Sequence, residues 1–189
     1  MASERPCLPP RVVIDANVLY PFHLRNLLIQ FGVDSIITPR WTARINAEWI
    51  GNLAATGRVS EDRLVHTLDL MNSVLPEAEV QGWETRMGDL TLPDPDDRHV
   101  LAAALTSTAE TILTKNLRDF PASALAPFGI VAVHPDAFMC KLFDGDPDLL
   151  RAAAGAAHAN LSRSAPSFEA YLDVLANQGL PQFAERLRG

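Results

Sequence analysis

The chain has 189 residues, of which 48% are hydrophobic, and its formal net charge at pH 7 is −7. A chain of this length and apolar content buries one sizeable core, so we expect one globular domain with an appendage, which excludes a disordered polypeptide. The negative charge is the opposite of what a protein needs to hold nucleic acid by bulk electrostatics. Clustered carboxylates can still contact phosphate groups when divalent cations lie between them.

Neither a membrane segment nor an export signal is visible in the sequence. No apolar stretch approaches the roughly 18 residues of a membrane span, and residues 1–10 lack the apolar segment of a signal peptide. We therefore expect a cytoplasmic protein with no membrane partner. Cys7 and Cys140 are expected to stay reduced, because the chain shows no signal for an oxidising compartment.

Strand and helix patterns alternate in the first two thirds of the chain. Short apolar runs predict strands at residues 12–14, 34–39, 111–114 and 129–133. Proline ends the second of these strands in this interpretation. Apolar periodicity and capping residues predict helices at residues 21–30, 40–55, 60–75 and 96–107. Short apolar strands that alternate with helices indicate a parallel sheet covered on both faces.

The composition shifts after His134 and Pro135, where the chain becomes helical and rich in alanine. We predict an α/β domain over residues 11–136 and an α-helical extension over residues 137–189. Within the extension, residues 167–177 place large apolar side chains on one helix face. That face is expected either to pack on its own domain or to form a partner or dimer surface.

Four acidic residues recur at comparable places in these elements. Asp15 directly follows the first strand, Glu48 lies beside the buried stripe of a tryptophan-rich helix, Asp97 is near a helix start, and Asp119 is in the turn after residues 111–114. Any one of them is explained as a cap or a polar turn residue. The carboxyl ends of parallel strands, however, form the crevice where ligands bind. Their recurrence therefore predicts a shared site.

A divalent cation is the expected occupant of such a site. Converging carboxylates repel one another unless a cation compensates, and oxygen ligands suit Mg²⁺ or Mn²⁺. Zinc is not supported, because the five histidines show no ligand spacing and there is no CxxC pair. The absence of GxGxxG, P-loop and GxSxG motifs disfavours dinucleotide binding, P-loop NTP hydrolysis and serine esterase chemistry.

Three acids compete for one role at the start of the helix at residues 96–107. Asp94, Asp96 and Asp97 all lie where a helix dipole favours negative charge. Simple capping explains one or two of them, and we assign the metal-binding role to Asp97, with Asp94 or Asp96 as alternatives. Basic residues flank the acids and are candidates either for holding a phosphate backbone or for plain ion pairs: Arg40, Arg44, Lys115 and Arg118.

Together these motifs resemble a PIN domain, and most closely the VapC-type ribonuclease toxins. The resemblance covers residues 11–136 and is carried by Asp15-Ala16-Asn17 after a strand, the mid-helix Glu48, the helix from Asp97, and the segment from Leu113 to Asp119. It implies an α/β three-layer sandwich with a small parallel sheet. It also implies RNA cleavage with Mg²⁺ or Mn²⁺ held by Asp15, Glu48, Asp97 and Asp119, supported by Thr114 and Asn116. An antitoxin partner and a homodimer are further expectations.

Other classes stay open at this point. HAD phosphatases also begin with a strand that ends in Asp, but they have a second Asp where this chain has Asn17. A protein-binding module with a degenerate acidic site is an alternative from a different class, as is a housekeeping nuclease. A structure-specific DNA nuclease would share the metal chemistry, but the net charge of −7 does not favour its usual basic clamp.

Overall fold

A four-stranded sheet forms the centre of the molecule. The computed structural model describes residues 8–161 and 166–189, so Cys7 lies outside the described residues. The strands are β1 (Arg11–Ile14), β2 (Thr38–Arg40), β3 (Thr111–Leu113) and β4 (Val131–Val133). They pair in the order β2-β1-β3-β4, and every pairing is parallel. The prediction of a small parallel sheet is confirmed.

Helices surround this sheet. The α-helices of the first part are α1 (Ala16–Leu19), α2 (Phe22–Val33), α3 (Ala43–Ala54), α4 (Glu61–Val74), α5 (Arg98–Ser107) and α6 (Ala122–Leu125). Short 3₁₀ segments are η1 (Trp83–Arg86), η2 (Pro95–Asp97), η3 (Leu117–Asp119) and η4 (Ala126–Phe128). The last part holds α7 (Pro135–Gly145), α8 (Pro147–Ala159), α9 (Phe168–Asn177) and α10 (Pro181–Arg188).

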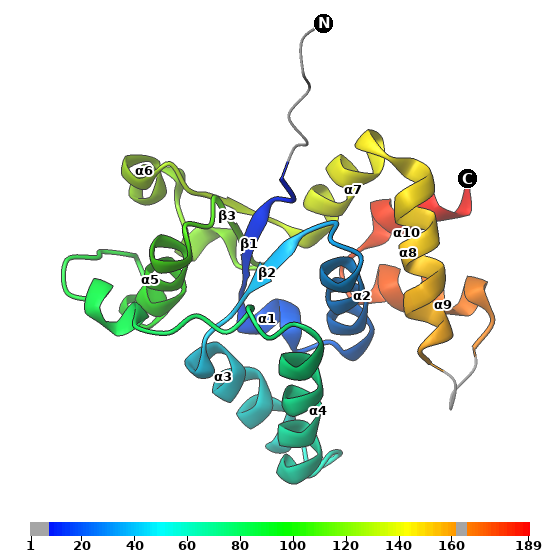
Figure 1. Cartoon of the computed structure of the whole chain (residues 1–189), viewed down its shortest axis with the longest axis horizontal. Coiled ribbons are helices and arrows are strands. Elements are labelled where there is room, and N and C mark those ends of the chain that lie inside the picture. Colours follow the sequence, from blue (N-terminus) through cyan, green and yellow to red (C-terminus); the bar gives the residue numbers. More distant parts are fainter. Residues whose placement is uncertain (1–7, 162–165) are drawn as a thin grey trace, which may run out of the picture.

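The helices form layers on the two sides of the sheet. Figure 1 shows α5 on one side, and α2 with α7, α8, α9 and α10 on the other. Val12, Val13 and Ile14 of β1 are fully buried between these layers. This arrangement agrees with the predicted α/β class with additional C-terminal helices. In the described parts of the chain, none of the helices has the length and apolarity needed to cross a bilayer.

The C-terminal helices pack on the rest of the molecule. α8 lies against α2, and α10 lies against α7 and α9. The apolar face of α9 is buried, since Tyr171, Leu172 and Leu175 are at most 1% exposed. The buried Asp136 carboxylate accepts hydrogen bonds from the backbone N–H groups of Gln182 and Phe183 at 3.2 and 2.9 Å, which satisfies the start of α10. The face of α9 therefore serves internal packing.

The strand predicted at residues 34–39 is wrong in its bounds. Residues 34–37 form the turn after α2, and β2 begins at Thr38 and includes Pro39. Proline usually ends a strand because it lacks an N–H donor. β2, however, is an edge strand that pairs only with β1, so no ladder bond is lost on its open side. The apolar run at Ile36 and Ile37 packs into the core without belonging to the strand.

The strand order creates a crevice between β1 and β3. The chain leaves β1 toward β2 on one side, while β3 and β4 extend the sheet on the other. Neighbouring parallel strands whose connections run in opposite directions leave such a crevice at their carboxyl ends. The ladder continues one residue past each strand, because Asp15 N–H donates to Leu113 O at 3.0 Å and Thr114 N–H donates to Val133 O at 3.2 Å.

Candidate active site

Asp15 and Thr114 meet at this crevice. Asp15 is 6% exposed and Thr114 is fully buried. The Thr114 hydroxyl donates to Asp15 Oδ2 at 2.7 Å, and Asn17 Nδ2 donates to the same oxygen at 2.5 Å. These two donors fix the orientation of the Asp15 carboxylate. A backbone hydrogen bond from Ala16 to the same carboxylate holds it further.

Asn17 joins the ends of the two strands. Its Nδ2 also lies 3.0 Å from Thr114 Oγ1, and its Oδ1 accepts from the backbone N–H of Lys115 at 3.0 Å. The Thr114 hydroxyl in turn accepts from the backbone N–H of Asn116 at 3.0 Å. A side chain that bridges two loops in this way holds their relative position, which is what a preorganised site requires.

Asp119 lies in the same loop after β3 as Thr114 and Asn116. Asn116 Nδ2 donates to Asp119 Oδ2, so the amide orients this carboxylate. The guanidinium of Arg118 lies 3.7 Å from the other carboxylate oxygen, but its side chain is 86% exposed. η3 ends at Asp119, which places the carboxylate in the turn after β3, as the sequence predicted.

Glu48 is held by two partners. On α3, Arg44 lies one helical turn earlier and its Nε is 3.4 Å from Glu48 Oε1. On α5, the buried His99 places Nε2 at 3.0 Å from the same oxygen. Burial alone raises the pKa of Glu48, but the hydrogen bond and charge of His99, followed by those of Arg44, outweigh it and leave that pKa below its usual value. Glu48 therefore stays ionised.

The three acids before α5 occupy different environments. Asp94 caps η2 by accepting from the backbone N–H of Asp96 at 2.9 Å. The side chain of Asp96 is 92% exposed and lies 3.9 Å from Arg44. Asp97 is the one of the three that lines a pocket together with Asp15 and Glu48. The geometry thus separates a cap, an exposed surface group and a pocket residue.

The pocket that collects these groups, called the acidic pocket below, has a volume of about 360 Å³. Its lining residues are Asp15, Ala16, Asn17, Tyr20, Glu48, Asn52, Asp97 and Asn116. Burial raises the pKa of Asp15; the Thr114 hydrogen bond opposes this and the charge of Glu48 adds to it. Burial, followed by the charges of Asp15, Asp94 and Asp119, raises the pKa of Asp97 to about 6. Repulsion by neighbouring acids thus adds to burial in disfavouring the charged form of both groups.

The donor set fits a hard divalent cation. Carboxylate and amide oxygens line the acidic pocket, and hard cations prefer oxygen ligands. Within residues 8–161 and 166–189, no three His, Cys, Asp or Glu side chains are already close enough to form a finished metal cage. The observation that fits a cation is therefore the set of oxygen donors that Asp15, Glu48 and Asp97 bring to one pocket. A positive charge there would relieve both the burial and the repulsion of these carboxylates.

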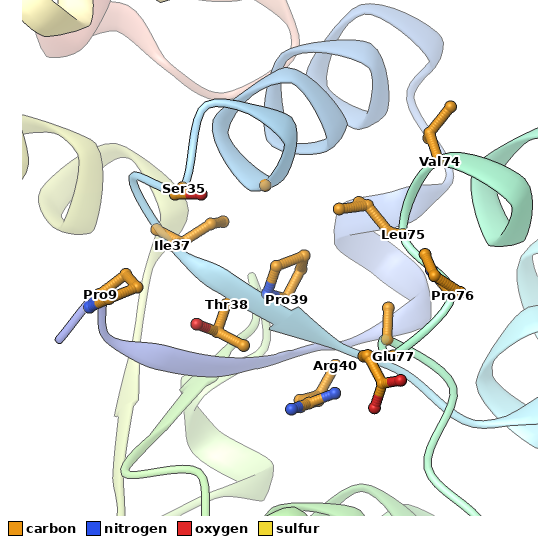
Figure 2. A pocket seen from close by; sticks show the side chains of 12 residues that line it. Pro9, Ser35, Ile37, Thr38, Pro39, Arg40, Val74, Leu75, Pro76 and Glu77 are labelled. Carbon is orange, nitrogen blue, oxygen red and sulfur yellow. The ribbon is translucent and has the colours of Figure 1, made fainter.

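The predicted phosphate-binding cations do not all gather here. Arg44 and Arg118 lie beside acidic residues of the site. Arg40 instead lines a separate pocket along β2, shown in Figure 2 with Pro39 and Leu75 among its walls. Lys115 is not among the residues that line the acidic pocket, and its ammonium group donates to the backbone carbonyl of Gln178 at 2.8 Å. The structure therefore does not bring Arg40 or the charged end of Lys115 into the acidic pocket.

Sequence reasoning missed His99. The five histidines were considered as metal ligands, and the absence of ligand spacing left His99 without a role. In the structure it is 1% exposed and contacts Glu48, while its ring meets Trp83 edge-to-face with centroids 6.0 Å apart. The available signal in the sequence was its position two residues after Asp97, at the start of the same predicted helix.

The comparisons with known proteins identify the class. The PIN domain family model matches residues 11–118, more than half of the chain, and this chain belongs to that family. A model described as the VapC50 C-terminal domain matches residues 135–189. The resemblance to a PIN domain is confirmed.

A relative adds a more specific similarity. The chain is 42% identical over 95 residues to "Putative ribonuclease VapC50" of Mycobacterium tuberculosis, and the match covers 49% of this chain and 54% of that protein. The chain thus matches about half the length of this relative. No solved structure matches the chain.

Proposed function

We propose that this chain is a metal-dependent ribonuclease that acts as the toxin of a toxin–antitoxin pair. The observation that carries the proposal is the acidic pocket at the β1–β3 crevice, where Asp15, Glu48 and Asp97 line one cavity. Membership of the PIN domain family and similarity to a protein named as a ribonuclease support RNA as the substrate.

Asp15, Glu48 and Asp97 would hold one or two Mg²⁺ or Mn²⁺ ions, with Asp119 as the fourth acid. When bound, the ion lowers the pKa of a water molecule and neutralises charge on the scissile phosphate. The residues that line the acidic pocket include no Ser, Cys or Lys side chain, and its carboxylates are assigned here to the metal. Water is therefore the proposed nucleophile.

The protein's own groups orient the carboxylates. Thr114 and Asn17 hold Asp15 through Oδ2, and the Ala16 backbone adds a further hydrogen bond. His99 and Arg44 bind one oxygen of Glu48, and Asn116 holds Asp119. Because these partners fix the ligand geometry before substrate arrives, little reorganisation is needed during the reaction.

For the RNA backbone, we propose contacts by Asn116, which lines the acidic pocket, and by Arg44 and Arg118, which lie 3.4 Å from Glu48 and 3.7 Å from Asp119. The side-chain positions of Arg40 and Lys115 do not support a direct contact with the scissile phosphate. We further propose that residues 11–136 form the nuclease unit and residues 137–189 a helical extension. A cognate antitoxin would cover the acidic pocket with a basic side chain, and a homodimer is the proposed assembly.

The first test is cleavage of labelled RNA and DNA of equal sequence with Mg²⁺, with Mn²⁺ and with a chelator. We expect RNA cleavage that requires the metal and is lost in Asp15→Asn. Asp89→Asn, which alters an exposed carboxylate away from the pocket, is the matched control and should cleave normally. Metal-dependent cleavage of DNA alone would favour the DNA nuclease. Absence of any cleavage would favour the protein-binding module.

The toxin assignment needs a separate test in cells. Induced expression of the chain alone should slow growth, and Asp15→Asn should relieve the effect. Co-expression of a small protein encoded beside it should restore growth and suppress RNA cleavage. A chain that cleaves RNA in vitro yet is harmless when well expressed would be a housekeeping nuclease.

A further inference from the structure

A second pocket adjoins the acidic pocket and has a volume of about 550 Å³. We call it the extension pocket, because Gln178 and Gly179, in the turn between α9 and α10, form one of its walls. Other lining residues are Tyr20 and Phe22, at the junction of α1 and α2, and Arg58, in the loop between α3 and α4. Tyr20 lines both pockets, which makes them neighbours.

Lys115 joins the extension pocket to the acidic pocket. Its backbone N–H donates to Asn17 Oδ1 at 3.0 Å, and Asn17 holds Asp15. Its Nζ donates to Gln178 O at 2.8 Å. One residue thus connects the site of the proposed metal to the C-terminal helices.

Gln178 fixes the wall from the other side. Its Oε1 accepts from the backbone N–H of Leu24 at 3.1 Å, and its Nε2 lies 3.2 Å from His23 Nδ1. The backbone bond decides which amide atom is oxygen, so Nε2 must be the donor and His23 Nδ1 the acceptor. Gly179 has φ +102°, a conformation that other residues rarely adopt, and its position facing Lys115 completes the turn. The pocket is therefore preformed.

Its exposed side chains combine aromatic and cationic groups. Phe22 is 51% exposed, although a large apolar ring normally avoids water. Arg58 is exposed and forms no ion pair among residues 8–161 and 166–189. Lys115 adds a second positive charge. In a chain of net charge −7, a pocket with two cations beside an acidic site stands out.

We propose that the extension pocket binds an unpaired base of a single-stranded RNA whose scissile phosphate lies in the acidic pocket. Unpaired bases stack on aromatic rings, and nearby cations hold the backbone between them. Phe22 and Tyr20 provide the rings, and Arg58 provides the cation. The C-terminal extension builds a wall of this subsite and so takes part in substrate selection. The inference rests on the proposed ribonuclease function for the identity of the ligand.

Binding of RNA, measured apart from cleavage, tests the subsite. The probe is a fluorescein-labelled single-stranded RNA of about 12 nucleotides and mixed sequence, and the full chain carries Asp15→Asn to prevent cleavage. Fluorescence anisotropy compares Phe22→Ala and Arg58→Gln in this background with two matched controls. Phe128→Ala removes another ring, 43% exposed on η4. Arg86→Gln removes another exposed arginine, on η1.

We expect Phe22→Ala to weaken binding about five- to a hundredfold, the range for loss of one stacked base. Arg58→Gln should weaken binding and reduce its salt dependence, while both controls should bind as the parent does. Equal affinity of the parent, Phe22→Ala and Arg58→Gln would overturn the inference, even if the wild-type chain cleaves RNA.

The proposed function fails on a different result. If the wild-type chain does not cleave RNA but RNA affinity falls in the two variants, the subsite proposal stands and the ribonuclease proposal fails. Because Phe22 and Arg58 are exposed, their replacement should preserve the circular dichroism spectrum. Gln178→Ala provides a third variant, which should weaken RNA binding by loosening the wall while Asp15 stays in place.

Discussion

The substitution Asp97→Asn distinguishes the effect of the Asp97 charge on folding stability from its proposed role in binding metal. In the metal-free chain the pKa of Asp97 is raised from 3.8 to about 6, first by burial and then by the charges of Asp15, Asp94 and Asp119. Between these two pH values the folded chain binds more protons than the unfolded chain. The stability contributed by this group is therefore fully present below pH 3.8 and is lost as the pH rises through about 6.

The magnitude follows from this difference. Without solvent screening, the difference between pKa 3.8 and about 6 would correspond to roughly 3 kcal/mol of folding free energy at neutral pH. The Asp97 side chain is partly exposed, and solvent screening reduces the effect to about 1 kcal/mol. Because Asn has the same shape without the charge, Asp97→Asn should raise the free energy of unfolding by about that amount in a chelator. The midpoint temperature should rise by about 2–4 °C for a chain of this size.

In saturating metal, the wild-type chain should become more stable than Asp97→Asn. A saturating ligand stabilises the folded chain by RT ln(1 + [L]/Kd), about 2.7 kcal/mol at a hundred times Kd. The free energy of unfolding of the wild-type protein should rise by this amount in Mn²⁺, and that of Asp97→Asn should rise much less. Thermal unfolding with chelator and with a Mn²⁺ series measures both effects. Asp96→Asn, whose carboxylate is 92% exposed, should behave as wild type in both. If Asp97→Asn is less stable than wild type in chelator, the Asp97 charge does not destabilise the fold. If its response to Mn²⁺ is undiminished, Asp97 does not bind the metal.

Other predictions concern the same site. Asp94→Ala should lower the free energy of unfolding by about 0.5–2 kcal/mol through loss of a cap, measured by urea unfolding, with cleavage retained. Mn²⁺ affinity and RNA cleavage should fall as the pH drops through about 6, because Asp97 must lose its proton to bind metal; a flat pH profile would contradict this. His99→Leu should leave Glu48 with Arg44 alone and raise the Mn²⁺ concentration needed for half-maximal cleavage. An unchanged Mn²⁺ requirement would make His99 a packing residue only.

The sequence was informative where a local pattern decides the geometry. β1 is a β-branched run followed by Asp15, and its burial and parallel pairing place that carboxylate at a strand end. Asp97 follows from its position at a helix start, although sequence alone did not separate it from Asp94 and Asp96. That separation depends on which way each side chain points after Pro95 begins η2, and only the three-dimensional structure gives it.

Contacts between distant segments could not be predicted from local sequence patterns. The bond between His99 and Glu48 joins α5 to α3, and no local spacing encodes how two helices pack. Lys115 was predicted to bind phosphate because it lies near acids, but the fold brings Gln178 to its ammonium group from 63 residues away. The apolar pair Ile36-Ile37 misled the prediction of where β2 begins, and the strand continues one residue past Pro39 because it lies at an open edge.

In the proposed mechanism, a metal ion held by the carboxylates would activate the water that hydrolyses RNA. Cleavage of a single-stranded RNA in ¹⁸O-labelled water with Mn²⁺, followed by mass spectrometry of the fragments, tests it most directly. We predict fragments with a terminal phosphate that carries one solvent oxygen, formed by the wild-type chain and not by Asp15→Asn. Fragments that end in a 2′,3′-cyclic phosphate, or cleavage that persists in chelator or in Asp15→Asn, would contradict the account.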